Sequence, residues 1–173
     1  MAHIIQCIVG SDAALEKIAA DWLHAKRVSI NLGYSLIPLT NELLDDMNEL
    51  ANIGMEQSSD AFQNLSKSVE HVLKESAYSE PIGYLETEYC GGIGTQSAIC
   101  YFKGKVLKGP LVTTTRWDHK MATYLRDPKG EGAINCILYE LGLEKRGDMD
   151  AFDSLKLGSY RSNQQLLSTL RKD

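Results

Sequence analysis

Apolar residues in the first half of the chain alternate between strand-like runs and helix-like stripes. Residues 3–9 form a short run rich in β-branched side chains, which predicts a buried strand. Over residues 13–23 the apolar positions recur at helical spacing and predict an amphipathic helix. The same reasoning predicts a strand over residues 28–39, which Gly33 interrupts. It also predicts two further helices, over residues 41–53 and 61–75.

The second half of the chain predicts a meander of antiparallel strands. Residues 82–88 and 96–102 have strand patterns on either side of a glycine-rich loop. A Lys-Gly-Lys turn then leads into a third strand over residues 106–115. Downstream, the pattern predicts a helix over residues 133–141, a half-buried turn at 151–152 and a final helix over 164–171.

This order of elements predicts one α+β domain over residues 1–173. The chain contains no internal repeat and no linker long enough to separate two domains. Its 43% hydrophobic content is sufficient for one substantial core. We therefore expect one mainly antiparallel sheet, including the three-strand meander, with helices backing it.

The charge and the cysteine content restrict the compartment and the partners. The chain has no apolar run of about 18 residues and no basic segment before its first apolar run, which disfavours membrane insertion and secretion. Its four cysteines are scattered and form no Cys-x-x-Cys pair, as is typical of reduced proteins. The formal net charge of −5 disfavours nucleic-acid binding and permits a basic protein partner. We expect a cytoplasmic protein that binds neither membranes nor nucleic acids.

The most distinctive segment is the glycine-rich loop formed by Gly91, Gly92 and Gly94. A phosphate-binding Walker loop requires Gly-Lys-Ser/Thr before a helix, and a dinucleotide fingerprint requires a third glycine where this chain has Ser97. The loop instead predicts a backbone that needs positive φ angles between two strands. A functional loop at the end of the sheet remains an alternative.

Polar residues on either side of this loop provide candidate chemistry. Glu86 and Glu88 lie two apart in a strand and therefore share one face, which we expect to be exposed or to face a partner. Such a pair suits acid–base chemistry, a metal ion, or simply a solvated strand face. Tyr89 is expected to face the other side of the sheet, and Gln96 begins the next strand.

Trp117, Asp118 and His119 place an aromatic ring, an acid and an imidazole in succession. An acid beside a histidine can orient a catalytic base, but the chain has no Gly-x-Ser-x-Gly elbow and no cysteine in a protease context. The four histidines also lack the spacing of metal ligands. The sequence thus predicts no metal site, cofactor or catalytic residue, and it favours a non-enzymatic role without deciding the matter.

Three segments together resemble a set of small, largely uncharacterised bacterial cytoplasmic proteins. The first is Glu-Thr-Glu-Tyr-Cys-Gly-Gly-Ile-Gly-Thr-Gln-Ser-Ala over residues 86–98, in which Cys90 replaces the usual aromatic residue. The second begins Ala-Ile-Asn and covers residues 133–143, and the third, with Asp-Ala-Phe-Asp, Leu-Gly and Tyr-Arg, covers residues 150–161. Proteins with this pattern resemble immunity proteins, which are small soluble antidotes that bind and block a toxin.

The resemblance implies a binding protein that neutralises a cognate bacterial toxin by occluding its active site. On this hypothesis the partner-binding residues are Glu86, Glu88, Tyr89, Gln96, Trp117, Asp118 and His119. One alternative is a small-molecule enzyme or ligand-binding protein that uses the glycine-rich loop 91–94 and the flanking carboxylates. Another is a homodimer or larger assembly of this chain.

Overall fold

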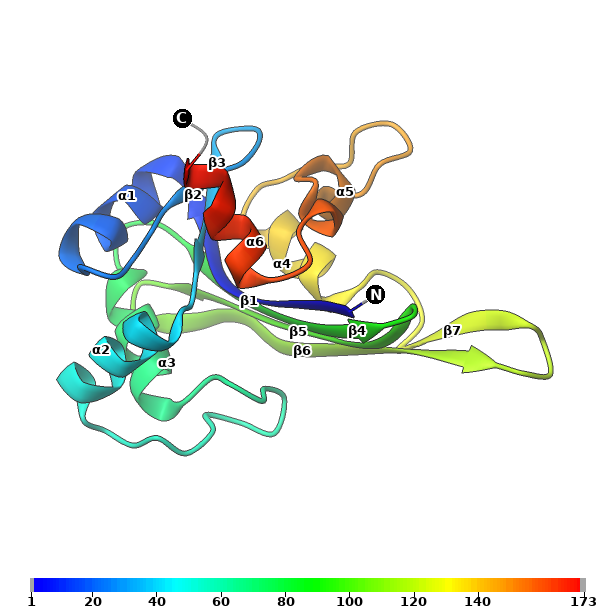
Figure 1. The fold of residues 1–173 in the computed structure, drawn as a ribbon, viewed down its shortest axis with the longest axis horizontal. Coiled ribbons are helices and arrows are strands. Elements are labelled where there is room, and N and C mark those ends of the chain that lie inside the picture. The colour runs from blue at the N-terminus through cyan, green and yellow to red at the C-terminus, as the bar shows by residue number, and fades with distance from the viewer. Residues whose placement is uncertain (1, 172–173) are drawn as a thin grey trace.

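One antiparallel sheet runs through the molecule. The computed structural model describes residues 2–171, so residues 1, 172 and 173 of the predicted domain lie outside it. Within the described residues, the sheet has seven strands in the order β2-β3-β1-β4-β5-β6-β7 (Figure 1). The strands are β1 (Ala2–Ser11), β2 (Val28–Ser29), β3 (Tyr34–Pro38), β4 (Ile82–Cys90), β5 (Ile93–Phe102), β6 (Lys105–Asp118) and β7 (Thr123–Asp127). The predicted α+β class with an antiparallel sheet is therefore confirmed.

The predicted meander forms one half of the sheet. β4, β5 and β6 pair in succession, each antiparallel to its neighbour, as the strand patterns predict. The meander continues into β7, which pairs with residues 114–118 of β6 and which the sequence did not predict. β1 joins the meander to the other half of the sheet, because it pairs with β4 on one side and β3 on the other.

Helices cover both faces of the sheet and give a three-layered molecule (Figure 1). On one face lie α1 (Asp12–Asp21), α2 (Asn41–Ala51) and α3 (Lys67–Ser76). On the other face lie α4 (Ala133–Glu140), α5 (Ala151–Ser154) and α6 (Asn163–Ser168). Short 3₁₀ turns, Leu157–Ser159 and Thr169–Arg171, follow α5 and α6.

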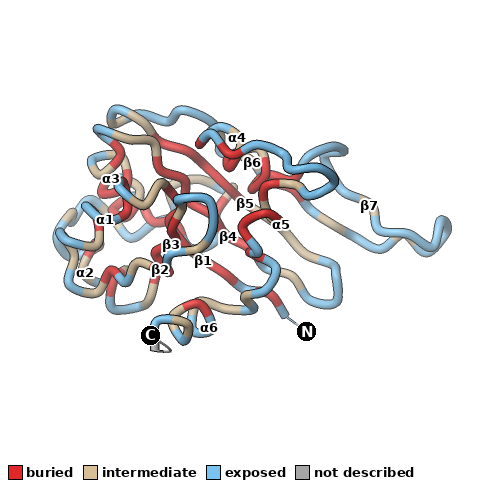
Figure 2. Tube along the Cα trace, turned by 90° about the horizontal axis from the view of Figure 1, so that it is seen from above, coloured by how far each residue is buried: buried red, intermediate tan, exposed pale blue. Residues whose placement is uncertain are grey.

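Alternate residues of the central strands contribute to two separate apolar cores. In β1, Ile8 belongs to the core with α1–α3, whereas Cys7 and Val9 belong to the core with α4–α6. Because both faces are covered at residues 7–9, this part of β1 is a continuous apolar run rather than an alternation of apolar and polar residues. Burial raises the pKa of the Cys7 thiol to about 12, so this side chain stays neutral. Figure 2 shows the buried positions concentrated in the central strands.

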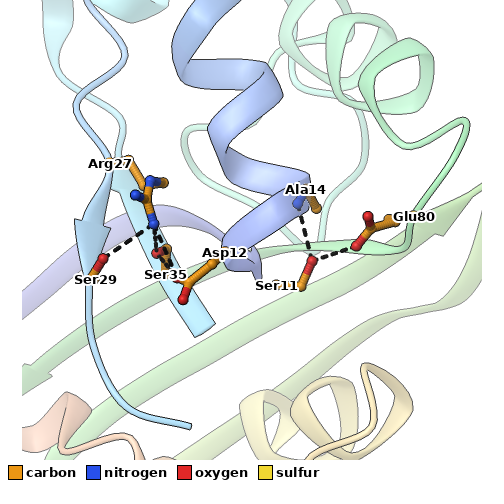
Figure 3. A network of polar contacts seen from close by, with 7 residues as sticks. All are labelled: Ser11, Asp12, Ala14, Arg27, Ser29, Ser35 and Glu80. Atoms are coloured by element: carbon orange, nitrogen blue, oxygen red, sulfur yellow. Dashed lines mark hydrogen bonds and ion pairs between the residues drawn. The ribbon is translucent and has the colours of Figure 1, made fainter. Parts of the chain in front are cut away.

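A polar network fixes the point where β1 leads into α1 (Figure 3). The Ser11 hydroxyl caps α1 and also donates a hydrogen bond to Glu80, in the segment before β4. The Asp12 carboxylate accepts hydrogen bonds from Arg27 Nη1, at 3.1 Å, and from the Ser35 hydroxyl. These contacts hold β3 and the chain before β2 against α1. The candidate sites lie toward the other end of β1.

One helix begins later than predicted. The helix expected over residues 61–75 starts at Lys67, because Ser66 caps it by accepting a hydrogen bond from the Val69 N–H at 3.1 Å. Residues 61–65 form a loop instead, and this loop proves to contact the sheet. The other predicted helices and strands are present with ends shifted by a few residues, and Gly33 lies in the turn between β2 and β3.

Candidate functional site

The glycine-rich loop is a tight hairpin turn. Only Gly91 and Gly92 lie between β4 and β5, with φ angles of 62° and 84°. A two-residue turn with positive φ at both positions suits glycine, which adopts this conformation without steric cost. Gly94, which the sequence placed in the loop, lies inside β5. The motif therefore shapes a β-hairpin, in agreement with the prediction of a conformationally demanding connection between two strands.

Gly94 leaves room for the close approach of the β4 backbone. An added Cβ at Gly94 would lie 1.9 Å from the Glu88 carbonyl oxygen and 2.7 Å from the Tyr89 Cα. With no side chain there, Tyr89 reaches across β5, and its hydroxyl lies 3.4 Å from Thr115 Oγ1 on β6. An aromatic side chain opposite a glycine is a known stabilising pair in sheets. The third glycine is thus required for packing rather than for turning the chain.

The register of the sheet separates the candidate residues onto two faces, because directly paired residues on antiparallel strands point to the same face. One row across the sheet joins Ile4, Glu88, Thr95, Thr114 and Asp127. The adjacent row, on the opposite face, joins His3, Tyr89, Gly94, Thr115 and Arg126. The prediction that Tyr89 faces away from the two glutamates is therefore confirmed, and the predicted residues do not form one site.

The face that carries Glu88 has an open groove of about 710 Å³. The groove lies between the sheet, the loop at residues 60–64 and the start of α6. Asp60, Glu86 and Glu88 line it, and no lysine, arginine or histidine is among the described residues of its lining. We call this feature the acidic groove.

Glu86 is held inside the protein at the base of the acidic groove. Its side chain is only 7% exposed, so the expectation of a solvated glutamate is wrong at this position. The carboxylate accepts hydrogen bonds from the N–H groups of Gln63 at 3.0 Å and Asn64 at 2.9 Å, and from the Tyr84 hydroxyl. Burial and the Glu86 charge raise the pKa of Tyr84 far above its ordinary value, which keeps its hydroxyl a donor. Glu88, in contrast, is exposed.

The face that carries Tyr89 has a second cavity, of about 490 Å³, which we call the arginine pocket. The sheet forms its floor, and β7 and the chain around residues 150–161 form its sides. All three segments of the resemblance meet here, through Tyr89, Gly92, Gln96, Asn135, Asp150, Phe152, Gly158 and Arg161. The glycine turn borders this pocket, whereas Glu86 and Glu88 line the acidic groove. The structure therefore separates the two parts of the small-molecule site that the sequence combined.

Hydrogen bonds between these segments explain how they build the pocket. The N–H groups at the start of α4 donate to the sheet, from Ala133 to Thr113 Oγ1 at 2.9 Å and from Ile134 to Gln96 Oε1 at 3.4 Å. Asn135 then joins α4 to the chain at the start of α5, because its Nδ2 donates to Asp150 Oδ2 at 2.7 Å. Gln96, Asn135 and Asp150 consequently hold the walls of the pocket in place.

His3 belongs to the arginine pocket, although the sequence predicted it only as a strand residue. Its Nε2 lies 3.3 Å from the Leu157 carbonyl oxygen, and its Nδ1 lies 2.9 Å from Thr87 Oγ1. A carbonyl oxygen only accepts hydrogen bonds, so we assign the proton to Nε2 and the Thr87 hydroxyl as donor to Nδ1. Burial of the ring lowers the pKa of His3, and the nearby Arg161 charge lowers it further. The imidazole is therefore neutral near pH 7.

This lowered pKa predicts an acid-sensitive contribution to stability. The unfolded chain binds a proton at His3 near the ordinary pKa of 6.5, whereas the folded protein does so only at lower pH. The contribution is therefore complete above pH 6.5 and is lost as the pH falls below that value. We expect the loss in the free energy of unfolding between pH 7.5 and 5.5 to be smaller in His3→Gln than in the native protein. Urea unfolding at both pH values measures this, with His71→Gln on the exposed side of α3 as the control. Equal pH dependence in the native protein and His3→Gln would contradict the assignment.

The β6–β7 hairpin continues beyond the rest of the sheet, and we call residues 116–125 the arm. Figure 1 shows it extending away from the three layers. The rings of Trp117 and Tyr124 pack edge to face with centroids 4.9 Å apart, and Met121 near the tip is 68% exposed. The Tyr124 hydroxyl donates to the Gly91 carbonyl oxygen at 2.9 Å, which ties the base of the arm to the β4–β5 turn.

The Trp-Asp-His segment lies at the end of the arm, where Asp118 closes the hairpin turn. Asp118 Oδ1 accepts hydrogen bonds from the N–H groups of Lys120 at 2.8 Å and Met121 at 3.2 Å, which closes the turn between β6 and β7. Within the described residues, Asp118 makes no hydrogen bond to His119, which is exposed. The carboxylate therefore stabilises the hairpin, and the exposed Trp117 and His119 remain surface residues at its end.

The described part of the chain contains no cluster of metal-binding side chains and no membrane-spanning helix. Among residues 2–171, no group of three or more histidine, cysteine, aspartate or glutamate side chains is arranged to hold a metal ion. No helix in that part of the chain is both long and apolar enough to cross a membrane.

No family model matches the chain, and no curated protein or solved structure matches it significantly.

Proposed function

We propose that this protein binds a cognate protein toxin and neutralises it by occluding the toxin's active site, as immunity proteins do. The observation that carries the proposal is the arm, which extends from the molecule and exposes large apolar side chains on a two-stranded hairpin. Trp117 remains 36% exposed and Tyr124 51% exposed. Aromatic side chains presented in this way dominate the binding energy of many protein interfaces.

The edge of the sheet at the arm adds a second reason to expect a protein partner. β7 is the last strand of the sheet and pairs only with β6 within the described residues, so its outer backbone groups have no strand partner there. Such edges are potential sites of pairing with another chain. A partner that covers the arm would also remove the exposed apolar side chains from water.

Charge indicates which kind of protein fits. The acidic groove lies on the face of the sheet that also carries Asp127 at the base of β7, through the row Glu88, Thr95, Thr114 and Asp127. The chain as a whole has a formal net charge of −5. Complementary charge steers partners together and excludes wrong ones. Trp117 and Tyr124 point to the other face of the sheet, so a partner that contacts both them and the acidic groove must wrap around the base of β7. At the acidic groove, a basic surface around the active site of a toxin is the occupant that we propose.

Co-expression with the products of adjacent genes tests this proposal. A stoichiometric complex is expected, and replacing both Trp117 and Met121 by alanine should weaken it by about 30-fold or more, because interface anchors contribute about 2 kcal/mol or more. The matched control replaces Tyr78 and Leu50 by alanine, since both are 75% exposed and lie outside the arm. Affinity that falls equally in both double variants would contradict a role for the arm.

A second copy of this chain is the alternative occupant of the arm. Light scattering of the purified protein distinguishes the two occupants. The proposal expects a monomer. A dimer of the native protein that becomes a monomer when Trp117 and Met121 are replaced would overturn the proposal in favour of self-association.

A further inference from the structure

We propose that the arginine pocket binds a small organic molecule through a carboxylate or phosphate group of that molecule. Both groups present paired, negatively charged oxygens, which is the arrangement that a guanidinium group recognises. The pocket lies on the opposite face of the sheet from the acidic groove. Tyr124 lies in both the arm and this pocket. The inference nevertheless does not depend on the proposed protein partner, because it concerns a ligand of the isolated protein.

Two arginines reach this pocket from opposite sides. Arg126 lies on β7, at one end of the cross-sheet row that ends at His3 on β1. Arg161 lies beside the other end, where its carbonyl oxygen accepts a hydrogen bond from the Ile4 N–H at 2.9 Å. Both residues line the cavity. Their positive charges therefore border one open pocket, with Tyr89 and Thr115 on the floor between them.

Neither of these arginines forms an ion pair with a carboxylate of residues 2–171. Arg126 Nη1 donates to the Gly130 carbonyl oxygen at 3.2 Å, which still leaves most of its N–H groups for another acceptor. Arg27, for comparison, is paired with Asp12 at 3.1 Å. Two arginines that share a cavity without such partners are suited to binding an oxyanion.

Neutral groups of the pocket complement the two charges. Gln96 lines the pocket, and its Oε1 accepts from the Ile134 N–H, whereas its Nε2 makes no hydrogen bond within the described residues and remains a donor for a ligand. The rings of Tyr124 and Phe152 provide apolar surface. The volume of about 490 Å³ is in the range of pockets that hold small organic ligands, which is larger than an inorganic ion requires. The pocket therefore suits an organic body as well as an anionic group.

The two carboxylates that line the arginine pocket, Asp150 and Asp153, do not cancel its preference for an anionic ligand. Asp150 Oδ1 accepts from the Asp153 N–H at 2.9 Å, and its Oδ2 accepts from Asn135 Nδ2, so both of its oxygens are engaged within the protein. Asp153 is exposed, as are Arg126 and Arg161, so water and salt screen all three charges, and one such carboxylate remains against two guanidinium groups. His3 is neutral and adds no charge. The guanidinium groups of Arg126 and Arg161 are thus the charged groups that remain to contact a ligand directly.

Titration of the isolated protein with phenyl phosphate and with benzoate, followed by amide chemical shifts, tests this inference. We expect saturable shifts in residues 89–96 and 158–161 with at least one of the two probes. A response to phenyl phosphate alone identifies the ligand as a phosphate, and a response to benzoate alone identifies it as a carboxylate. Absence of saturable binding by both probes, or shifts confined to the acidic groove, would overturn the inference.

Matched variants assign the binding to the two arginines. Arg126→Gln and Arg161→Gln should each weaken binding of the responding probe by about tenfold or more, because each removes one charged contact. Arg116→Gln is the control, because Arg116 is on β6 next to Thr115 but points to the other face of the sheet. Retained affinity in both Arg126→Gln and Arg161→Gln, or an equal loss in Arg116→Gln, would contradict the proposed contacts.

Discussion

Replacing Gly94 by alanine is expected to destabilise the fold by about 4 kcal/mol or more, which is at the upper end of single substitutions. The new Cβ would lie 1.9 Å from the Glu88 carbonyl oxygen, and this backbone atom cannot move away without disturbing the pairing of β4 with β5. The clash therefore falls on the strands that carry both the acidic groove and the arginine pocket. Urea unfolding followed by circular dichroism measures the loss.

Gly91→Ala is the matched control for this prediction. Gly91 also has a positive φ, of 62°, but an added Cβ there meets no atom within 4 Å. Only the conformational cost of a side chain in the left-handed region remains, which is about 1–2 kcal/mol. If the two variants lost similar stability, the close approach at Gly94 would not be the reason for the third glycine.

Replacing Glu86 by alanine should lower the free energy of unfolding by about 3 kcal/mol, whereas Glu88→Ala should change it by less than about 0.5 kcal/mol. Loss of the Glu86 carboxylate removes the acceptor of three hydrogen bonds, from Gln63, Asn64 and the Tyr84 hydroxyl. The Tyr84 side chain is fully buried in the native protein, so its hydroxyl would lose its carboxylate acceptor in a poorly solvated position. Chemical unfolding of the two variants under one set of conditions provides the comparison.

The difference between these glutamates affects how binding experiments are designed. A charge reversal at Glu86 would disturb the loop at residues 61–65, and any loss of partner binding would then follow from altered structure. Glu88 is exposed in the same groove, so a charge reversal there changes the surface potential without removing an internal contact. Equal loss of stability in Glu86→Ala and Glu88→Ala would show that Glu86 does not anchor the loop.

Local patterns in the sequence predict most of the sheet. Residues 82–102 contain two strand patterns around adjacent glycines, and this information is sufficient to specify a hairpin. The alternation along β4 also correctly places Glu86 and Glu88 on one face and Tyr89 on the other. β7 could not be predicted because it is short and its Tyr124 is exposed. The strand therefore lacks the alternation of buried and exposed residues on which strand prediction depends.

The sites themselves depend on contacts between distant segments. The loop at residues 61–65 buries Glu86 by donating two backbone hydrogen bonds to it. The sequence pattern assigns the same residues to a helix. The arginine pocket combines His3, Arg126 and Arg161, which come from the start of the chain, an unpredicted strand and the segment before α6. No spacing rule connects such residues, so the sequence alone could not bring them together. The resemblance covers three of the contributing segments, residues 86–98, 133–143 and 150–161, without indicating that they line one cavity.

Protection of cells from a toxic partner tests the proposed function most directly. The product of an adjacent gene is expressed alone, with the native protein, or with the protein in which Trp117 and Met121 are replaced by alanine, and growth is measured. The account predicts growth arrest by the partner alone, full protection by the native protein and by the Tyr78 and Leu50 control, and loss of protection with the arm variant. Partners that are harmless alone, or protection that does not require the arm, would contradict it.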